Sequence, residues 1–268
     1  MKPTAVLAGL LLSLIVAGGA IGACFEPGDA PCAVSLVGDS LPPFLYSESD
    51  NYITSGVAFD MINAIFRNIP EAHVAFPRMP WKRSLLQMEL GDKDGVALII
   101  KTPAREKNLV FSLPYIQADA KVFYNKKRFP NGFSWSSLND LKGYRVGLIA
   151  GHYFGEEVER ARKDGTLTID ESTNVDLAFR LLEYRRVDFT IISVPVALAS
   201  VRQAGWLDDL GIADKVVTTY QFHIGISLNS QARRLIPRIN EAIIHLAETG
   251  EADEMLVPFG ASSPPMDE

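Results

Sequence analysis

The chain has 268 residues and a formal net charge of −6, from 26 basic and 32 acidic side chains. This balance does not suit a nucleic-acid partner, since binding to phosphate backbones relies on an excess of basic residues. The length is sufficient to bury large cores and lies where one domain tends to become two.

The first 23 residues predict export. Lys2 precedes an apolar run at 5–16 and small residues at 17–23, which is the layout of a secretory signal. The run is shorter than the roughly 20 apolar residues of a membrane-spanning helix. We therefore expect 1–23 to be a signal peptide and the mature protein to lie in the periplasm. Its removal leaves 245 residues, with 25 basic and 32 acidic side chains.

The only two cysteines, Cys24 and Cys32, allow two interpretations. Cleavage after Ala23 leaves both thiols able to form a disulfide in an oxidising compartment. Residues 21–24 also read as a lipoprotein signal, in which case Cys24 carries the lipid anchor and Cys32 stays alone. Even cysteine parity favours the disulfide.

The mature chain alternates strand and helix patterns, which predicts an α/β fold with largely parallel sheets. The strand patterns occur at 33–38, 73–76, 96–100, 145–149, 189–192, 215–218 and 223–227. The helix patterns occur at 57–69, 81–90, 154–162, 175–184, 196–204 and 231–249. No internal repeat is found, and the tail at 261–268 is expected to be loose.

The segment 101–115, KTPAREKNLVFSLPY, sets a single arginine between two apolar runs. A guanidinium matches a carboxylate with two parallel hydrogen bonds, so Arg105 is a candidate anchor for a small acid, although most arginines are ordinary surface charges. The segment resembles the T-x-x-R-x-x-x-x-x-F-S-x-P-Y signature of the family 3 extracellular solute-binding proteins, which deliver polar amino acids to ABC importers. The matching residues are Thr102, Arg105, Phe111, Ser112, Pro114 and Tyr115.

The resemblance covers about 34–257 and implies a two-lobed periplasmic binding protein fold (type II). It implies two hinge strands and a ligand cleft between the lobes, which close around ligand by hinge motion. On this pattern, lobe 1 comprises 24–120 and 219–268, and lobe 2 comprises 121–218.

In lobe 1, the resemblance points to three positions besides Arg105. Phe44 ends a P-P-F turn and is expected to form an apolar wall at the cleft rim, or alternatively to belong to the core. Trp81, in a P-W-x-R motif, is expected to stack on ligand or to cap the helix start. Thr102 is expected beside the Arg105 anchor.

In lobe 2, residues 138–151 resemble the L-x-D-L-K-G-x-x-V-G…G stretch of the family, whose turn opens a helix with amides suited to an anion. The chain then departs from its relatives. It has His152 and Tyr153 where they have a small hydroxyl residue, and Ser193 near the place of the aspartate that takes an amino acid's ammonium. Asp39 is the nearest acid that could replace this aspartate. We expect these four side chains in the site, and His152 could instead be satisfied by local backbone.

Enzyme functions have weaker support. Residues 38–41 spell the G-D-S-L string of one class of serine esterases, but the D-x-x-H that supplies their base is missing, since Ala242 and two isoleucines precede His245. Some proteins on this scaffold act as dehydratases or lyases, and others as sensory modules, so both remain alternatives.

The sequence and the resemblance together predict a non-enzymatic solute-binding protein. Its expected ligand is a small carboxylated solute, an amino acid or a relative of one, and its expected partner is an ABC transporter permease. We expect a monomer with no nucleic-acid partner. The four histidines show no metal-like spacing, so neither a metal nor another cofactor is expected.

Overall fold

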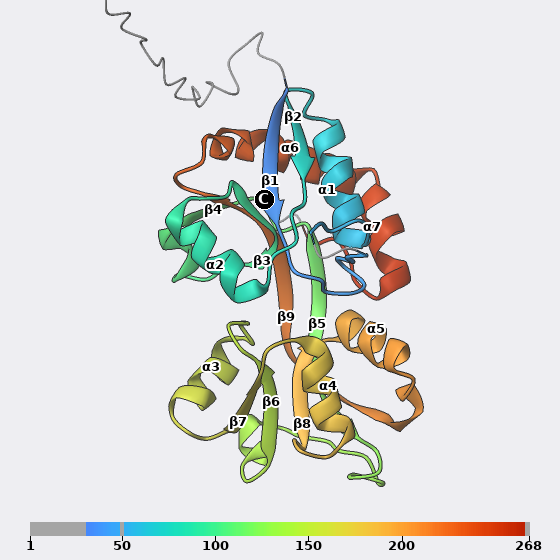
Figure 1. Cartoon of the computed structure of the whole chain (residues 1–268). Helices are drawn as coiled ribbons and strands as arrows, with labels where there is room; N and C mark the ends of the chain where they lie inside the picture. The colour runs from blue at the N-terminus through green and yellow to red at the C-terminus, as the bar shows by residue number, and fades with distance from the viewer. Residues whose placement is uncertain (1–30, 49–50, 266–268) are drawn as a thin grey trace, which may run out of the picture.

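The computed structural model describes residues 31–48 and 51–265. Its elements gather into two groups, one above the other, and only β5 and β9 run through both (Figure 1). The upper group contains β1 to β4, α1, α2, α6 and α7, and the lower group contains β6 to β8 and α3 to α5. The predicted signal peptide and Cys24 lie outside the described residues, so the signal, the disulfide and the lipid anchor stay predictions.

The structure has nine strands in its described part. They are β1 (Cys32–Val37), β2 (Ala72–Ala75), β3 (Gly95–Ile100), β4 (Leu109–Phe111), β5 (Ile116–Asn125), β6 (Arg145–Ile149), β7 (Thr168–Ser172), β8 (Phe189–Ser193) and β9 (Leu210–Ser227). The α-helices of the described part are α1 (Val57–Arg67), α2 (Trp81–Leu90), α3 (Glu156–Lys163), α4 (Val175–Glu183), α5 (Val194–Ala204), α6 (Ile236–Glu248) and α7 (Glu251–Leu256).

One continuous sheet runs through both groups in the order β2-β1-β3-β9-β5-β8-β6-β7, with β4 paired to β9. The pairs β1–β2, β1–β3, β6–β7 and β6–β8 are parallel. Every antiparallel pair involves β5 or β9. The expectation of largely parallel sheets is therefore correct for the outer strands. It is wrong for the centre of the sheet, where β5 and β9 form an antiparallel pair.

The β5–β9 ladder is irregular at the level where the two groups meet. Ala120 pairs with Thr218, but the next residue, Lys121, pairs with Val216, so β9 carries one extra residue at this point. A bulge of this kind bends and twists a strand locally. It lies where the resemblance places the crossings between lobes.

The helices pack because their apolar residues recur on one face. In α1, Val57, Met61, Ile65 and Ile62 are each at most 2% exposed, at the spacing of a single helix face. The N-terminus of α4 is capped by Asn174, whose Oδ1 accepts a hydrogen bond from the Leu177 amide at 2.9 Å. The predicted α/β alternation is thus realised by ordinary amphipathic helices on a buried sheet.

Most predicted elements are present, with shifts of one or two residues at their ends. The patterns at 215–218 and 223–227 belong to one strand, β9, and the helix predicted at 231–249 begins as a 3-10 turn before α6. The sequence analysis gave no strand pattern for the ten-residue β5, and it also missed β4, β7 and α7. The elements β4, β7 and α7 are short, with three, five and six residues, so their periodicity carries little signal.

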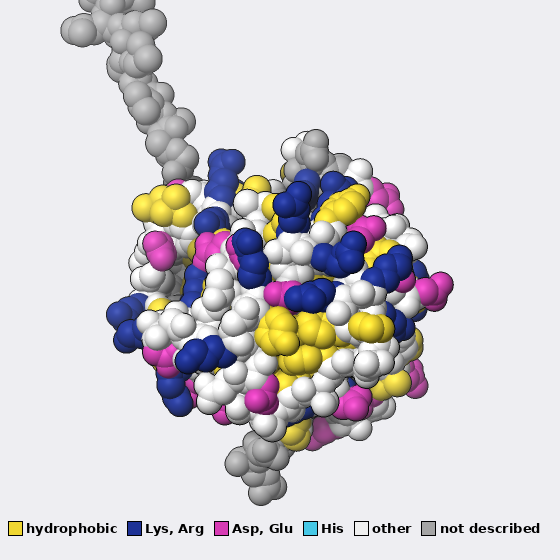
Figure 2. All heavy atoms as spheres, turned by 90° about the horizontal axis from the view of Figure 1, so that it is seen from below, with side chains coloured by type: hydrophobic (Ala, Val, Ile, Leu, Met, Phe, Trp, Pro, Cys, Tyr) yellow, Lys and Arg dark blue, Asp and Glu magenta, His cyan; other side chains and the backbone are white. Residues whose placement is uncertain are grey.

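At the lower end of the molecule, basic and acidic side chains are interspersed and surround a patch of hydrophobic side chains (Figure 2). Neither sign dominates this face, so it presents no broad field of one charge. No helix among the described residues is long and apolar enough to cross a bilayer.

A buried hydrogen bond ties the start of β5 to the centre of β3. The Tyr115 side chain is 1% exposed, and its hydroxyl donates to the Ala97 carbonyl oxygen at 2.7 Å. Replacing Tyr115 by Phe leaves that carbonyl without this donor. We expect Tyr115→Phe to lower the free energy of unfolding by about 1 to 2 kcal/mol, measured by urea denaturation.

The matched control for this change is Tyr184→Phe, because Tyr184 is 70% exposed. It should alter the unfolding free energy by less than about 0.5 kcal/mol. Equal urea midpoints for the two variants would contradict a stabilising role for the Tyr115 hydroxyl.

Candidate ligand-binding site

A cavity of about 90 Å³ lies between the two groups and against β9. Its wall is built from loops that follow strands of both groups and is mostly apolar. The lining residues are Asp39, Ser40, Leu41, Leu45, Trp81, Leu98, Ile99, Ile100, Arg105, Ile149, His152, Tyr153, Phe154, Thr173, Asn174, Val175, Ile192, Ser193, Val196, Tyr220 and Phe222. A cavity of this size has room for several water molecules or a small organic solute.

The topology explains why this position collects polar side chains. Asp39 follows β1, Arg105 follows β3, His152 follows β6, Asn174 follows β7 and Ser193 ends β8. All of these positions lie at the carboxyl ends of strands in the parallel parts of the sheet, where loops of neighbouring strands converge and where ligands bind in open α/β folds. Six of the eight predicted site residues line this cavity, and Phe44 and Thr102 do not.

Arg105 extends from a short 3-10 turn (Arg105–Lys107) just after β3. One terminal nitrogen, Nη1, donates to the Ile100 carbonyl oxygen at 2.6 Å, and Nη2 donates to the Gly151 carbonyl oxygen across the cavity at 3.3 Å. Burial lowers the pKa of Arg105 to about 10, against a smaller opposing effect of Glu159, so the group stays cationic at neutral pH. A guanidinium has five N–H groups, so N–H donors remain for a ligand anion.

Trp81 contacts the same carbonyl oxygen from the first turn of α2. Its indole Nε1 donates to the Gly151 carbonyl oxygen at 2.9 Å, and the Arg105 Cζ atom lies 5.3 Å from the indole centroid. The Arg105 cation therefore rests against an aromatic face that orients it. Trp81 is the first residue of α2, but the cap position is Pro80 and no side-chain hydrogen bond caps this helix. The Trp81 indole lines the cavity, and its stacking on a ligand stays a prediction.

Gly151 is suited to this contact by its backbone. It has a φ of +81°, and a Cβ placed on it would lie 3.4 Å from the Trp81 ring. An L-amino acid side chain rarely adopts this φ, so glycine lets the carbonyl oxygen face both donors while the main chain approaches the indole. The glycine that ends the family-like stretch 138–151 thus has a physical role here.

His152 and Tyr153 follow Gly151 and present uncharged groups to the cavity. The His152 ring lies edge-on to Trp81, with centroids 5.6 Å apart. Burial, and then the Arg105 cation, lower the pKa of His152 to about 4. Burial, followed by Glu156 and Glu159, raises the pKa of the Tyr153 hydroxyl. Both side chains are therefore neutral near pH 7 and can take part only through hydrogen bonds and packing.

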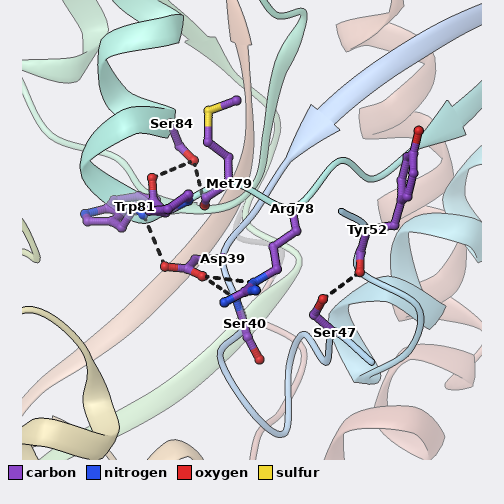
Figure 3. Close-up of polar contacts among 9 residues, drawn as sticks. Asp39, Ser40, Ser47, Tyr52, Arg78, Met79, Trp81 and Ser84 are labelled. Atoms are coloured by element: carbon purple, nitrogen blue, oxygen red, sulfur yellow. Dashed lines mark hydrogen bonds and ion pairs between the residues drawn. The ribbon is translucent and has the colours of Figure 1, made fainter. Parts of the chain in front are cut away.

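The Asp39 carboxylate already has hydrogen-bond and ion-pair partners within the protein (Figure 3). Its Oδ2 accepts a hydrogen bond from the Trp81 amide at 3.2 Å, and its Oδ1 accepts one from the Ser40 amide at 2.8 Å and lies 3.6 Å from Arg78 Nε. An ion pair and the N-terminus of α2 thus offset the carboxylate charge on the cavity wall. Asp39 lines the cavity, but its charge is largely balanced within the protein.

Ser193 and Asn174 place two helix N-termini at the cavity. Ser193 precedes α5 and is 2% exposed, while Asn174 precedes α4. The positive ends of both helix dipoles therefore face the same space as Arg105. This arrangement favours a ligand with negative charge.

Two predicted positions lie elsewhere. Phe44 was expected at the cleft rim or, alternatively, in the core; it is 0% exposed and packs in the core, with its ring 5.5 Å from the ring of Phe222. Phe222 and Leu45 reach the cavity in its place, because the turn at 41–45 folds Phe44 inward. Thr102 supports Arg105 from behind, since its carbonyl oxygen accepts a hydrogen bond from the Arg105 amide at 3.0 Å.

The sequence analysis missed the contribution of β9. Tyr220 and Phe222 both line the cavity, and they are two residues apart on one strand, so they share a face. This alternation was visible in the sequence, but only the fold shows that the face is turned toward the cavity. The Tyr220 hydroxyl is buried and has no hydrogen-bond partner among the described residues.

The lowered pKa of His152 predicts a pH dependence of stability. An unfolded chain binds a proton at this histidine below about pH 6.5, whereas the folded chain binds it only near pH 4. Between these values the unfolded state holds more protons, so stability should fall as the pH is lowered from about 6.5 to about 4. We expect the Tm of the wild-type protein to fall more steeply over this interval than the Tm of His152→Gln, measured by calorimetry. Parallel curves for the two proteins would contradict a buried neutral imidazole.

Comparison with known proteins places this chain in a family. The model of the family described as "Bacterial extracellular solute-binding proteins, family 3" matches residues 34–260. A probable histidine-binding protein of Neisseria gonorrhoeae is 26% identical over 263 residues, which cover 96% of this chain and 94% of that protein. An ABC transporter arginine-binding protein of Escherichia coli (strain K12) is 24% identical over 222 residues, covering 80% of this chain and 84% of the other.

Solved structures confirm the expected α/β periplasmic binding protein fold. An ancestral arginine-binding protein bound to arginine aligns with a TM-score of 0.70 at 24% identity, covering 86% of this chain and 98% of the other. A histidine kinase sensor domain with similarity to periplasmic binding proteins aligns with a TM-score of 0.73 at 17% identity, covering 87% and 98%. An ancestral amino acid-binding protein, a precursor of cyclohexadienyl dehydratase, aligns with a TM-score of 0.68 at 20% identity, covering 85% and 95%. The match to the family description over 34–260 identifies the chain as a member of the family 3 bacterial extracellular solute-binding proteins.

Proposed function

We propose that this protein is an exported receptor that captures a small carboxylated solute and delivers it to an ABC importer. The observation that carries the proposal is the position of Arg105, a half-buried cation with unused N–H donors on the wall of a mostly apolar cavity between two groups of elements. A planar guanidinium in such surroundings binds a carboxylate bidentately, and removal from water strengthens the pair. Relatives named as histidine- and arginine-binding proteins support the small-acid ligand and the link to an importer.

The binding mechanism follows from the contacts around Arg105. Ligand carboxylate oxygens would meet the free N–H groups of Arg105, while Trp81 and the neutral His152 and Tyr153 pack around the ligand. Ser193, before α5, contributes a polar group and the positive end of the helix dipole. Asp39 helps to hold the first turn of α2, and thereby Trp81, in place.

We further propose that the two groups are lobes that move on β5 and β9. The lobes would comprise 24–120 with 219–268 and 121–218, so the boundaries fall at the irregular pairing of Ala120, Lys121 and Thr218. The shared acceptor at the Gly151 carbonyl would hold the closed form, because Trp81 and Arg105 reach it from the other group. Hinge closure around a ligand is a common mode of such proteins.

The proposal includes the exported location and the state of the mature chain. The predicted signal peptide at 1–23 would direct the protein to the periplasm, where a monomer would meet its permease. A disulfide between Cys24 and Cys32 remains our proposal for the mature N-terminus, and a lipid on Cys24 is the alternative.

Binding is favoured over a dehydratase or lyase activity by the chemistry of the cavity. A general base works best with a pKa near the operating pH, and the pKa of His152 is lowered to about 4. Asp39 is tied to Arg78 and to backbone amides, so it does not form an acid and base pair with a neighbouring group in the cavity.

Arg105→Gln tests the proposal, since it removes the cation while keeping a polar side chain. We expect the affinity for the best ligand from a thermal-shift screen of small carboxylic acids to weaken by about 2 to 5 kcal/mol, measured by isothermal titration calorimetry. The matched control is Arg180→Gln, because Arg180 is an exposed residue of α4 that does not line the cavity. An unchanged affinity in Arg105→Gln would refute the anchor.

A further inference from the structure

Tyr220 is a cavity-lining residue whose hydroxyl makes no hydrogen bond to the described residues. It lies in β9 and is 6% exposed. A buried hydroxyl without a partner is unfavourable, and native structures usually supply a protein, water or ligand atom. A ligand atom within reach of Oη would complete this bond.

The phenol acts as a neutral group. Burial raises the pKa of Tyr220 far above its usual range, and Glu159 and Tyr153 add smaller effects in the same direction. Oη therefore keeps its proton at neutral pH and can donate it to an acceptor. An oxygen acceptor on the ligand satisfies the hydroxyl without any charge.

The charges of the cavity do not suit an ammonium group. Among the lining residues the charged side chains are Arg105 and Asp39, and Asp39 is already paired with Arg78 and two backbone amides. Glu159 does not line the cavity; its Oε1 accepts a hydrogen bond from the Phe154 amide, and its Oε2 lies 4.0 Å from Arg162. Glu159 acts on Arg105, Tyr153 and Tyr220 from beyond the cavity wall. A buried ammonium would therefore meet no free carboxylate on the wall itself, at a cost of several kcal/mol in general.

Aliphatic side chains from both groups form a large part of the remaining wall, beside polar residues such as Asn174 and Ser193. The aliphatic side chains give an apolar ligand body a surface to pack against, with no need for further polar groups. They include Leu45, Leu98 and Ile100 from the upper group and Ile149, Val175 and Val196 from the lower group.

We propose that the ligand is an aliphatic acid that carries a neutral oxygen acceptor beside its carboxylate, such as a 2-oxo acid, and that the Tyr220 hydroxyl donates to that acceptor. This inference rests on the proposed function, because it takes Arg105 as the carboxylate anchor. It departs from the amino-acid ligands named for relatives, since the acceptor replaces the ammonium group. Tyr220 thus acts as a specificity-determining residue, and Arg105 supplies most of the affinity.

The test compares three acids with the same carbon skeleton by isothermal titration calorimetry. 4-Methyl-2-oxopentanoate carries the oxo acceptor, leucine carries the ammonium, and 4-methylpentanoate carries neither. In the wild-type protein we expect the oxo acid to bind about tenfold more tightly than 4-methylpentanoate, as one buried hydrogen bond allows, and leucine to bind most weakly.

Two variants complete the design. In Tyr220→Phe the advantage of the oxo acid over 4-methylpentanoate should fall to about one, while the affinity for 4-methylpentanoate stays within about twofold, because the ring is retained. Tyr184→Phe, at an exposed position away from the cavity, should leave all three affinities unchanged.

The outcomes separate this inference from the proposed function. If leucine binds as tightly as the oxo acid and Arg105→Gln abolishes its binding, the carboxylate receptor stands and the 2-oxo acid proposal is wrong. If Tyr220→Phe keeps the preference for the oxo acid, the role of Tyr220 is wrong. If the acids bind equally well to Arg105→Gln, or if none binds the wild-type protein, the inference falls together with the anchor on which it depends.

Discussion

The contact on which the site depends is the Gly151 carbonyl oxygen, which accepts hydrogen bonds from Arg105 and Trp81 across the cavity. A guanidinium that is partly removed from water needs acceptors, and this one finds them on the Ile100 and Gly151 backbones. The same two bonds join the upper and lower groups. Arg105, the proposed ligand anchor, therefore also helps to hold together the two groups that enclose the cavity.

The charges around the cavity favour a negatively charged ligand group. Burial keeps the imidazole of His152 and the phenols of Tyr153 and Tyr220 neutral near pH 7. Internal partners balance the Asp39 carboxylate, whereas the Arg105 cation makes its hydrogen bonds to backbone oxygens, rests against a tryptophan face and feels only a smaller effect of Glu159. A negatively charged ligand group would complete this balance, and water exclusion makes such a pair stronger than it is at a surface.

The fold places these groups together through strand connectivity. The loops after β1, β3, β6, β7 and β8 meet at one level of a continuous sheet, and β9 runs past that level with Tyr220 and Phe222 facing the cavity (Figure 1). The irregular pairing near Thr218 bends the ladder close to the same level. The proposed binding site and the proposed hinge thus share one region of the molecule. Contacts to a ligand in this region would bias the closure of the two groups.

Local pattern was sufficient for most elements and for the motif that carries Arg105. The spacing of apolar residues predicts α1 and the short apolar runs predict β3 and β6, since one element's face is set by its own residues. The resemblance of 101–115 to a family signature points to Arg105, the proposed anchor, from sequence alone.

Tertiary structure decided the rest, because burial and partners depend on residues far apart in the chain. Phe44 faces the core because Phe222, 178 positions later, covers it, and Asp39 is balanced because Arg78 and α2 pack beside it. The role of Tyr220 arises only when β9 passes between the two groups. A sequence states which side chains are present, whereas the surroundings that neutralise, cover or expose them are assembled by folding.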